Sequence, residues 1–410
     1  MEFLDKIQIR IFSAIFFLSM YAITSIISNA LYSITLTTLG VIVLYVYKAA
    51  SKDTIRFIYP EKSFLLVYLP FFILIIASSI GIGYKDSISK AIDITSWSLV
   101  PFLLYYFSMQ RVFFHEPMVL GIISGSWTLG IYGLYQYIYS DSGRIQSYLS
   151  QPNYLAEMIE MSIPFLFLYV LQKSADEKIK IVSIITGSML VILLFMTKSR
   201  GGISGLIAGG SCLFFIRCIL LRIETKQVFK YFVALLIVAC GTIIFFYSQH
   251  TSQNENVGIT RSYDYERILL WESSYDMWKN HRAFGIGLRH WHDEYISKYI
   301  SPDAKEPNLE FPHNIYMYFI SETGTLGGVG ILFFTVGVFF YFVLLLKRNP
   351  DNIFVNAFIW SFLIIMIHGQ VDAGITNKFV MRLYSTYLGI TLASVVYYNY
   401  FGSKEYKVIN

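Results

Sequence analysis

Three side chains of this sequence combine residue types and positions that could carry out chemistry. Arg200 stands between an apolar segment and two glycines, and Arg267 lies one helical turn before Trp271. The planar guanidinium of arginine can bind phosphate oxygens through two parallel hydrogen bonds. His313 follows a proline and precedes Asn314, and a neutral imidazole near pH 7 can accept a proton from a hydroxyl group. These residue types predict a site that stabilises negative charge on a phosphate and activates a hydroxyl.

Each of these residues also has a simpler interpretation, in which it supports structure. An arginine at the end of a membrane span can be an interfacial anchor, and a lone histidine is more often structural than catalytic. Residues 263–280, placed on a helical wheel at about 100° per residue, bring Arg267, Trp271 and Trp278 to one face. This pattern predicts an amphipathic helix on the outer membrane surface, with its indoles at the headgroups. An arginine on that face needs an anionic partner, either an internal carboxylate or a substrate phosphate.

Other polar residues near the ends of apolar segments are weaker candidates. Arg144 precedes Asn153 in a loop, and Asp372 follows His368 by one helical turn. Asp372 could orient a catalytic group or solvate a turn. His290 and the acidic residues near it could bind a metal, but a solvated loop explains them equally well. From the residues alone, both roles of Asp372 stay open, Arg144 has no assigned role, and a metal site is the less favoured interpretation of His290 and its neighbours.

Long apolar segments must position these side chains. Hydrophobic residues make up 55% of the 410 residues, charged residues make up 14%, and the mean hydropathy is +0.54. A soluble domain contains about 25% charged residues, and a single core could not bury so much apolar surface. The composition excludes a soluble enzyme, a disordered chain and a repeat solenoid. The continuous apolar runs also argue against a β-barrel, whose strands alternate in hydrophobicity.

These runs predict an all-α, polytopic integral membrane protein with about twelve transmembrane helices, because each helix needs about 20 apolar residues. Lysines and arginines concentrate in one alternate set of loops, so both termini are expected in the cytoplasm and residues 248–312 outside. We expect the first nine transmembrane helices in residues 1–247, a periplasmic loop domain with amphipathic helices in residues 248–323, and the last three helices with a short cytoplasmic tail in residues 324–410. The expected spans are residues 11–28, 31–47, 64–83, 91–109, 118–139, 153–171, 181–197, 203–221, 231–247, 324–346, 353–371 and 380–401.

Taken together, these motifs resemble the signature of the O-antigen ligase family. The resemblance runs from about residue 144 to residue 372, with the motifs in the order and topology of the family. Each motif is short, but the set is fairly specific. The residues that carry it are Arg144 followed by Gln151-Pro152-Asn153, Ser199-Arg200-Gly201-Gly202, Arg267-x-x-x-Trp271 followed by residues 281–287, His313-Asn314 followed after nine residues by Gly324-x-x-Gly327, and His368-x-x-x-Asp372.

The resemblance implies glycosyl transfer on the periplasmic side of the bacterial inner membrane, in lipopolysaccharide biosynthesis. For a ligase, the donor is a glycan on undecaprenyl diphosphate and the acceptor is a hydroxyl of lipid A–core. His313 is then the expected general base, and Arg200 and Arg267 are the expected diphosphate-binding residues. With two arginines on the diphosphate, no metal ion or other cofactor is expected, and the partners are lipid-borne glycans and the bilayer rather than nucleic acid. The remaining expected substrate-binding residues are Arg144, Asn314, which could orient His313 or a sugar hydroxyl, and Asp372.

Two rival functions stay open at the level of sequence. O-antigen polymerases share the architecture and extend the lipid-linked glycan itself, although the spacing after His313 fits the ligase pattern better. A polysaccharide transporter or flippase tends to show inverted repeats and charged or broken helices at mid-membrane. The expected spans are mostly free of charge, with Asp93 as an exception, and polar residues concentrate in the outer loop instead. The prediction is therefore a membrane glycosyltransferase, with the ligase preferred.

Overall fold

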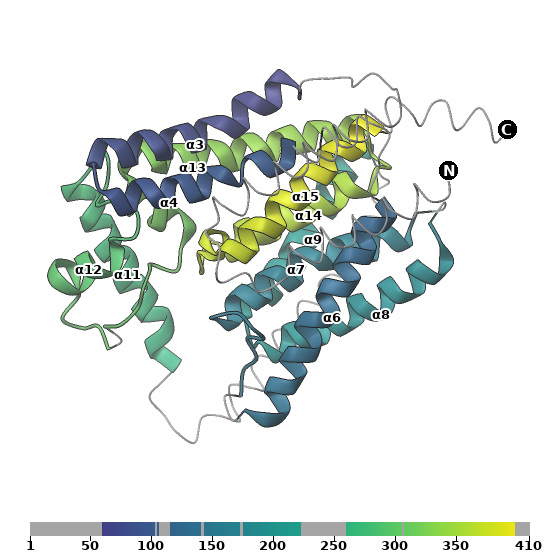
Figure 1. The fold of residues 1–410 in the computed structure, drawn as a ribbon, viewed down its shortest axis with the longest axis horizontal. Coiled ribbons are helices and arrows are strands. Elements are labelled where there is room, and N and C mark those ends of the chain that lie inside the picture. Colours follow the sequence, from purple (N-terminus) through teal and green to yellow (C-terminus); the bar gives the residue numbers. More distant parts are fainter. Residues whose placement is uncertain are drawn as a thin grey trace, which may run out of the picture.

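Helices form most of the part of the chain that the structure describes (Figure 1). The computed structural model describes residues 60–102, 105, 115–140, 143–172, 175–222, 260–305 and 307–397, and among these residues there is no strand. The all-α fold class is therefore confirmed for them, while the spans expected at residues 11–28, 31–47 and 231–247 lie outside them. The elements are α3 (Lys62–Ile82), α4 (Lys85–Ser96), α6 (His115–Tyr139), α7 (Pro152–Val170), α8 (Glu177–Met196), α9 (Arg200–Leu221), α11 (Thr260–Asn280), α12 (Trp291–Glu294), η1 (Tyr295–Tyr299), α13 (Ile315–Arg348), α14 (Ile353–His368), η2 (Gly374–Thr376) and α15 (Lys378–Tyr397).

Five of the described helices are long and apolar enough to cross a membrane, namely α3, α8, α9, α13 and α15. A further helix, α14, is apolar but has only 16 residues. Apart from α13, these helices begin within a few residues of the expected spans, because a continuous apolar run fixes where a transmembrane helix lies. The described helices thus support a multi-pass membrane protein.

The span expected at residues 91–109 differs from the structure. The chain already becomes helical at Lys85 and forms α4, a helix of 12 residues with buried and exposed faces. Asp86 lies in its first turn, where a carboxylate stabilises the amino end of a helix. Asp93, within the expected span, therefore belongs to the short amphipathic helix α4, while residues 103–104 and 106–109 of that span lie outside the described residues.

The helices pack along one another in a bundle. α13 lies along α3, α14 packs against both α9 and α7, and α8 packs against α7 and α6 (Figure 1). Gly205 and Gly209 of α9 face Ile364 of α14, and a Cβ on Gly209 would lie 3.1 Å from the backbone nitrogen of Ile364. Small residues four positions apart let two helices approach closely within a membrane, where close packing holds helices together. The glycines therefore fix the distance between α9 and α14.

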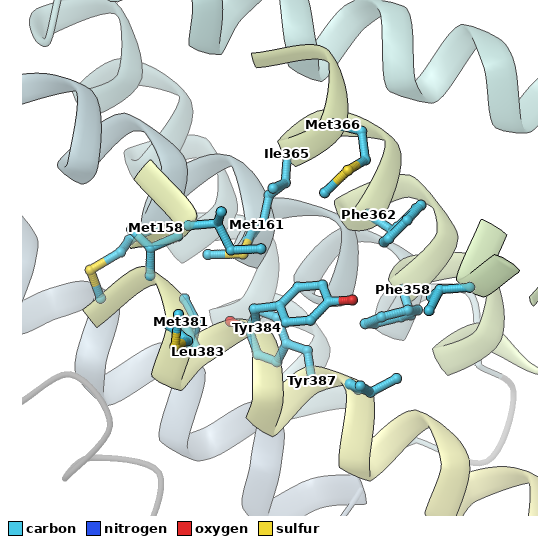
Figure 2. Close-up of a cluster of buried hydrophobic side chains, with 14 of the residues drawn as sticks. Met158, Met161, Phe358, Phe362, Ile365, Met366, Met381, Leu383, Tyr384 and Tyr387 are labelled. Carbon is cyan, nitrogen blue, oxygen red and sulfur yellow. The ribbon is translucent and has the colours of Figure 1, made fainter. Parts of the chain in front are cut away.

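Side chains of α7, α14 and α15 meet in the centre of the bundle (Figure 2). Met158 and Met161 of α7 share a buried cluster with Phe358 of α14 and Tyr384 of α15. The rings of Phe358 and Tyr384 lie 5.7 Å apart, and the flexible methionines fill the space around such rigid rings. This core holds the three helices in a fixed arrangement. The polar site described below lies at the ends of these helices or in the turns next to them.

A break at Gly324 divides α13 into two parts. The helix has 34 residues and would be about 51 Å long at 1.5 Å per residue, whereas the hydrocarbon core is about 30 Å thick. Gly324 has φ 63° and ψ −161°, a conformation that glycine adopts easily and other residues do not. The carbonyl oxygens of Ser321 and Glu322 accept hydrogen bonds from the amides of Ile286 and Gly287 at 3.0 and 2.9 Å. The span expected from residue 324 is therefore the second part of a longer helix, whose break is stabilised by another segment.

Residues 281–290 pack tightly on this break. The backbones of Gly285 and Gly324 are in contact, because a Cβ on either glycine would lie 2.5 Å from backbone atoms of the opposite segment. The hydroxyl of Ser78 on α3 lies within 2.9 Å of carbonyl oxygens from both segments. The segment that contains α11 and α12 is thus joined directly to α3 and α13.

Residues 260–312 also have a small core of their own. The expected helix is present as α11 (Thr260–Asn280), and its position at the membrane surface stays a prediction. The indole nitrogen of Trp271 donates to the carbonyl oxygen of Pro312 at 2.9 Å, and that of Trp278 donates to the hydroxyl of Thr325 at 3.0 Å. Both ring nitrogens therefore join α11 to neighbouring parts of the protein. The buried residues of the small core are Leu270, Met277, Ile286, Trp291 and Tyr295.

Candidate active site

His313 lies in a constrained turn between the α11–α12 segment and α13. Its φ angle is 50°, a conformation that is uncommon for residues other than glycine and that clusters at functional sites. On one side, Trp271 binds the carbonyl oxygen of Pro312. On the other side, Asn314 caps α13, because its side-chain oxygen accepts from two amides of the first turn at 2.9 and 3.0 Å. The position of His313 is therefore set from both sides.

The second end of the Asn314 side chain contacts the turn after α14. Its amide nitrogen donates to the carbonyl oxygen of Gln370 at 3.0 Å, and the amide of Ile315 donates to the carbonyl oxygen of Gly369 at 2.8 Å. Both ends of Asn314 are thus engaged within the protein. This arrangement suits the first of its two expected roles, which is to orient His313, better than contact with a sugar hydroxyl.

The turn after α14 brings Asp372 to His313. The Nδ1 atom of His313 lies 3.6 Å from Oδ1 of Asp372, and the Asp372 side chain is fully buried. Burial alone would raise the pKa of Asp372, but the neighbouring His313 and His368 imidazoles and the amide of Ala373 together outweigh it and hold the pKa below its ordinary value. An ionised carboxylate therefore faces the imidazole, while the His313 side chain is 16% exposed.

Asn153 and Arg144 extend this pair toward α8. The side-chain nitrogen of Asn153 donates to Oδ2 of Asp372, and its oxygen accepts from Arg144 at 3.3 Å. Arg144 also donates from Nε to the carbonyl oxygen of Thr197 at 2.9 Å. Arg144 is exposed, so its guanidinium is fixed by the protein yet open to a ligand.

Two further exposed cations lie in the turn between α8 and α9. Arg200 is the first residue of α9, where the free amides and the helix dipole also favour an anion. Lys198 has φ 53°, and its ammonium lies close to Gly143, the neighbour of Arg144 in sequence. Lys198 directly precedes the Ser199-Arg200-Gly201-Gly202 motif in the sequence. The structure brings Arg144, Lys198 and Arg200 to adjoining turns, which can bind an anion.

Arg267 lies on α11, one turn before the contact with Pro312. It is half-buried and has interactions within the chain. Its neighbour Glu266 is buried, and its carboxylate accepts from the amide of Lys305 at 2.9 Å. Trp271, one turn after Arg267 on the same face, is the α11 residue that contacts the turn before His313.

A buried polar cluster next to these residues was missed by the sequence analysis. Glu157 and Glu160 of α7 lie 4.0 and 2.7 Å from Nδ1 of His368, and all three side chains are at most 1% exposed. The signal was present, because two carboxylates within an otherwise apolar span are expensive in a membrane and mark functional or structural networks. The continuous hydrophobicity of residues 153–171 concealed them.

The cluster explains the glycines that follow Arg200. A Cβ on Gly201 would lie 2.5 Å from the His368 ring, and a Cβ on Gly202 would lie 3.1 Å from Oε2 of Glu160. Glycine is needed where a backbone comes this close to a neighbour. The backbone at the start of α9 therefore comes close to the buried cluster at both glycines.

A second group of charges surrounds the loop that follows α11. Arg289 lies 3.6 Å from Asp93 of α4, and its amide donates to Glu322 at 3.0 Å. Lys90 donates to the carbonyl oxygen of Thr376 at 3.4 Å. Burial lowers the pKa of Lys90, and the positive charge of Arg289 lowers it further. This group connects α4, α13 and the end of η2.

The residues considered for metal binding make other contacts. His290 stacks against Tyr84 with ring centroids 4.8 Å apart, and Nδ1 of His292 lies 2.9 Å from the carbonyl oxygen of Leu309. Within the described residues, no group of three His, Cys, Asp or Glu side chains is arranged to hold a metal ion. The cations described above are the groups that could bind a phosphate directly.

Comparison with known proteins agrees with this arrangement. Residues 185–332 match a family model described as O-antigen ligase, and this range contains Arg200, Arg267 and His313. No curated protein matches the chain. The match to residues 185–332 and the order of the motifs support the O-antigen ligase family for this chain.

Proposed function

We propose that this protein is an O-antigen ligase of the bacterial inner membrane. It transfers a glycan from undecaprenyl diphosphate to a hydroxyl of lipid A–core, on the periplasmic side and without a metal ion. The observation that carries the proposal is the His313–Asp372 pair in a structure that also fixes the exposed guanidinium of Arg144 through Asn153. Transfer of a glycan from a diphosphate donor needs a proton acceptor and an anion-binding group, and here both are linked through Asn153 and Asp372.

The proposed reaction follows from the roles of these groups. The acceptor oxygen attacks the anomeric carbon of the donor sugar, a new C–O bond forms, and the bond from that carbon to the diphosphate breaks. The undecaprenyl diphosphate leaves with the electron pair, and the guanidinium groups of Arg200 and Arg267 stabilise its charge, supported by Arg144. Removing one well-placed donor of this kind costs about 10²–10³ in rate.

His313 is the proposed general base. Its Nδ1 atom faces Asp372, so Nε2 is the nitrogen that can accept the proton of the hydroxyl, because a neutral imidazole has one acceptor nitrogen. The ionised Asp372 carboxylate then stabilises the imidazolium that forms, as in other His–Asp pairs. The proton taken from the acceptor thus stays at the site until the diphosphate has left.

A deletion strain tests this proposal through its glycolipids. Loss of a ligase leaves lipid A–core without O-antigen, while lipid-linked polymer accumulates. Core that carries a single repeat unit would identify a polymerase instead. Lipid-linked glycan that accumulates without reaching the periplasmic face would identify a flippase and reject the proposed function. Complementation with the wild-type chain, but not with His313→Ala, links the result to this site.

A further inference from the structure

The amino-terminal half of α7 carries three polar side chains on one face. Asn153, Glu157 and Glu160 are spaced by four and three residues, so they follow one another along the same side of the helix. Asn153 binds Asp372, and Glu157 lies directly against the first residue of η2, where any Cβ would overlap its carboxylate. Glu160 binds His368 of α14. One helix face therefore contacts the end of α14, the turn that carries Asp372, and η2.

A continuous polar chain runs from this face through α14 to the start of α9. Oε1 of Glu160 lies 2.7 Å from Nδ1 of His368, and Nε2 of His368 lies 3.5 Å from Oγ of Ser199. Ser199 caps α9, whose first residue is Arg200. The three side chains of this polar chain, Glu160, His368 and Ser199, are at most 3% exposed, so a substrate cannot contact them.

Buried charged groups are costly inside a helix bundle, and the same helices already have a simpler link. The hydroxyl of Ser361 on α14 donates to the carbonyl oxygen of Met161 on α7 at 2.7 Å. An ordinary hydrogen bond therefore suffices to join α7 to α14. The polar chain differs because it ends at the amino end of α9, beside Arg200.

We propose that the polar chain is a positioning device for Arg200, which fixes the amino end of α9 without contacting substrate. The inference rests on the proposed function, because it takes Arg200 as a diphosphate-binding residue. Asn153, on the same face of α7, holds Asp372 and through it His313. One helix face therefore sets the distance between the group that binds the leaving diphosphate and the base that activates the acceptor.

A double-mutant cycle in the purified full-length protein tests the proposal. H368Q and R200K are compared singly and together, with undecaprenyl diphosphate-linked glycan as donor and lipid A–core as acceptor. Glutamine stays polar but cannot bridge both partners as imidazole does. We expect H368Q to raise the donor KM about tenfold and to leave the acceptor KM unchanged. In the double variant, H368Q should add little to the loss caused by R200K, because the effects of residues that act through one another are not additive. The matched control S361A should change neither KM.

Losses that multiply in the double variant, or an equal rise in both KM values, would overturn the proposal. If H368Q fails to accumulate in the membrane, E160Q replaces H368Q in the cycle, because glutamine keeps the size of the Glu160 side chain. Binding of undecaprenyl diphosphate alone separates this inference from the proposed function. If the wild-type protein does not transfer glycan, the proposed function is rejected. If H368Q nevertheless weakens undecaprenyl diphosphate binding about tenfold and S361A does not, the positioning of Arg200 is still supported. Equal binding of undecaprenyl diphosphate by H368Q and S361A overturns the positioning inference.

Discussion

The indole nitrogen of Trp271 donates a hydrogen bond to the carbonyl oxygen of Pro312, at 2.9 Å. The residue after Pro312 is the candidate base, so a side chain of α11 sets the turn from which His313 extends. This contact connects the α11–α12 segment to the proposed chemistry without placing Trp271 itself in contact with substrate.

Trp271→Phe should therefore slow transfer while the protein stays folded. A hydrogen bond of this kind contributes about 0.5–1.5 kcal/mol, so we expect a loss of about tenfold or less in kcat. Trp278→Phe is the matched control, because it removes a hydrogen bond from the same helix face to Thr325. Thr325 follows the break at Gly324, so this bond does not join α11 to the turn that carries His313. Equal losses for the two variants, at matched membrane levels, would show that the contact with Pro312 has no special role.

His313→Ala should abolish glycan transfer and leave the protein in the membrane. Removing a general base costs about 10²–10⁴ in rate, and the cavity left by a 16% exposed side chain does not threaten the fold. The measurement is the amount of transferred glycan per unit of membrane-inserted protein. His290→Ala is the control, because His290 stacks on Tyr84 outside the pair. Near-normal transfer by His313→Ala would exclude it from the mechanism.

Asp372→Asn should slow transfer and also change how acid affects stability. The His313 and His368 imidazoles and the Ala373 amide outweigh burial and lower the pKa of Asp372 on folding. Such a carboxyl group adds stability above its unfolded pKa of 3.8, and this stability is lost as the pH falls through the lower folded value. Below about pH 4, the unfolding temperature of the wild type should fall more steeply than that of the variant. Parallel curves in a thermal unfolding series would contradict this.

Arg267→Lys should be far more harmful than Arg282→Lys. Lysine keeps the charge but lacks the planar fork that binds two phosphate oxygens, so the first change should cost about 10²–10³ in rate. Arg282 is exposed and lies over the ring of Trp278 at 5.9 Å, where lysine can substitute with little loss. Transfer rates at saturating lipid-linked donor distinguish the two. Similar rates would make Arg267 a structural residue and move the diphosphate toward Arg200 and Arg144.

Glycan transfer by the purified protein should survive strong chelation. The proposed diphosphate-binding groups are guanidiniums, which stabilise phosphate charge directly. Activity is compared before and after EDTA, with added Mg²⁺ or Mn²⁺ as the recovery step. Loss with EDTA and recovery with either ion would point to Asp264, Glu266 and His290 as groups to test next.

Length and continuous hydrophobicity predicted where α3, α8, α9 and α15 begin, and these are four of the five membrane-length helices among the described residues. α4 begins at Lys85, ahead of the expected span, and α13 also differs. Its apolar run begins at Gly324, but the helix begins at Ile315, because the amides of Ile286 and Gly287 satisfy carbonyl groups at the break. Those partners are distant in the sequence, so no local pattern indicates them.

The sequence indicates candidate residues one by one, and their roles stay predictions; the contacts between them come from the structure. The approach of His313 to Asp372 agrees with motifs that the sequence places in the right order. The wheel argument correctly grouped Trp271 with Trp278, but a wheel cannot say that the shared face contacts protein. Glu157 and Glu160 were missed because residues 153–171 were interpreted by their average hydrophobicity. The partner of both carboxylates is His368 on another helix, which the local sequence does not indicate.

The contact between the backbones of Gly285 and Gly324 leaves no hinge between the α11–α12 segment and α13. A transmembrane helix changes its tilt when the bilayer becomes thicker or thinner. Because His313 stands at the amino end of α13 and the segment is joined to the break, both move as that helix tilts. We therefore expect the depth of the proposed site relative to the lipid headgroups to follow bilayer thickness, so that lipids of different chain length should vary how a membrane-borne substrate meets the proposed base.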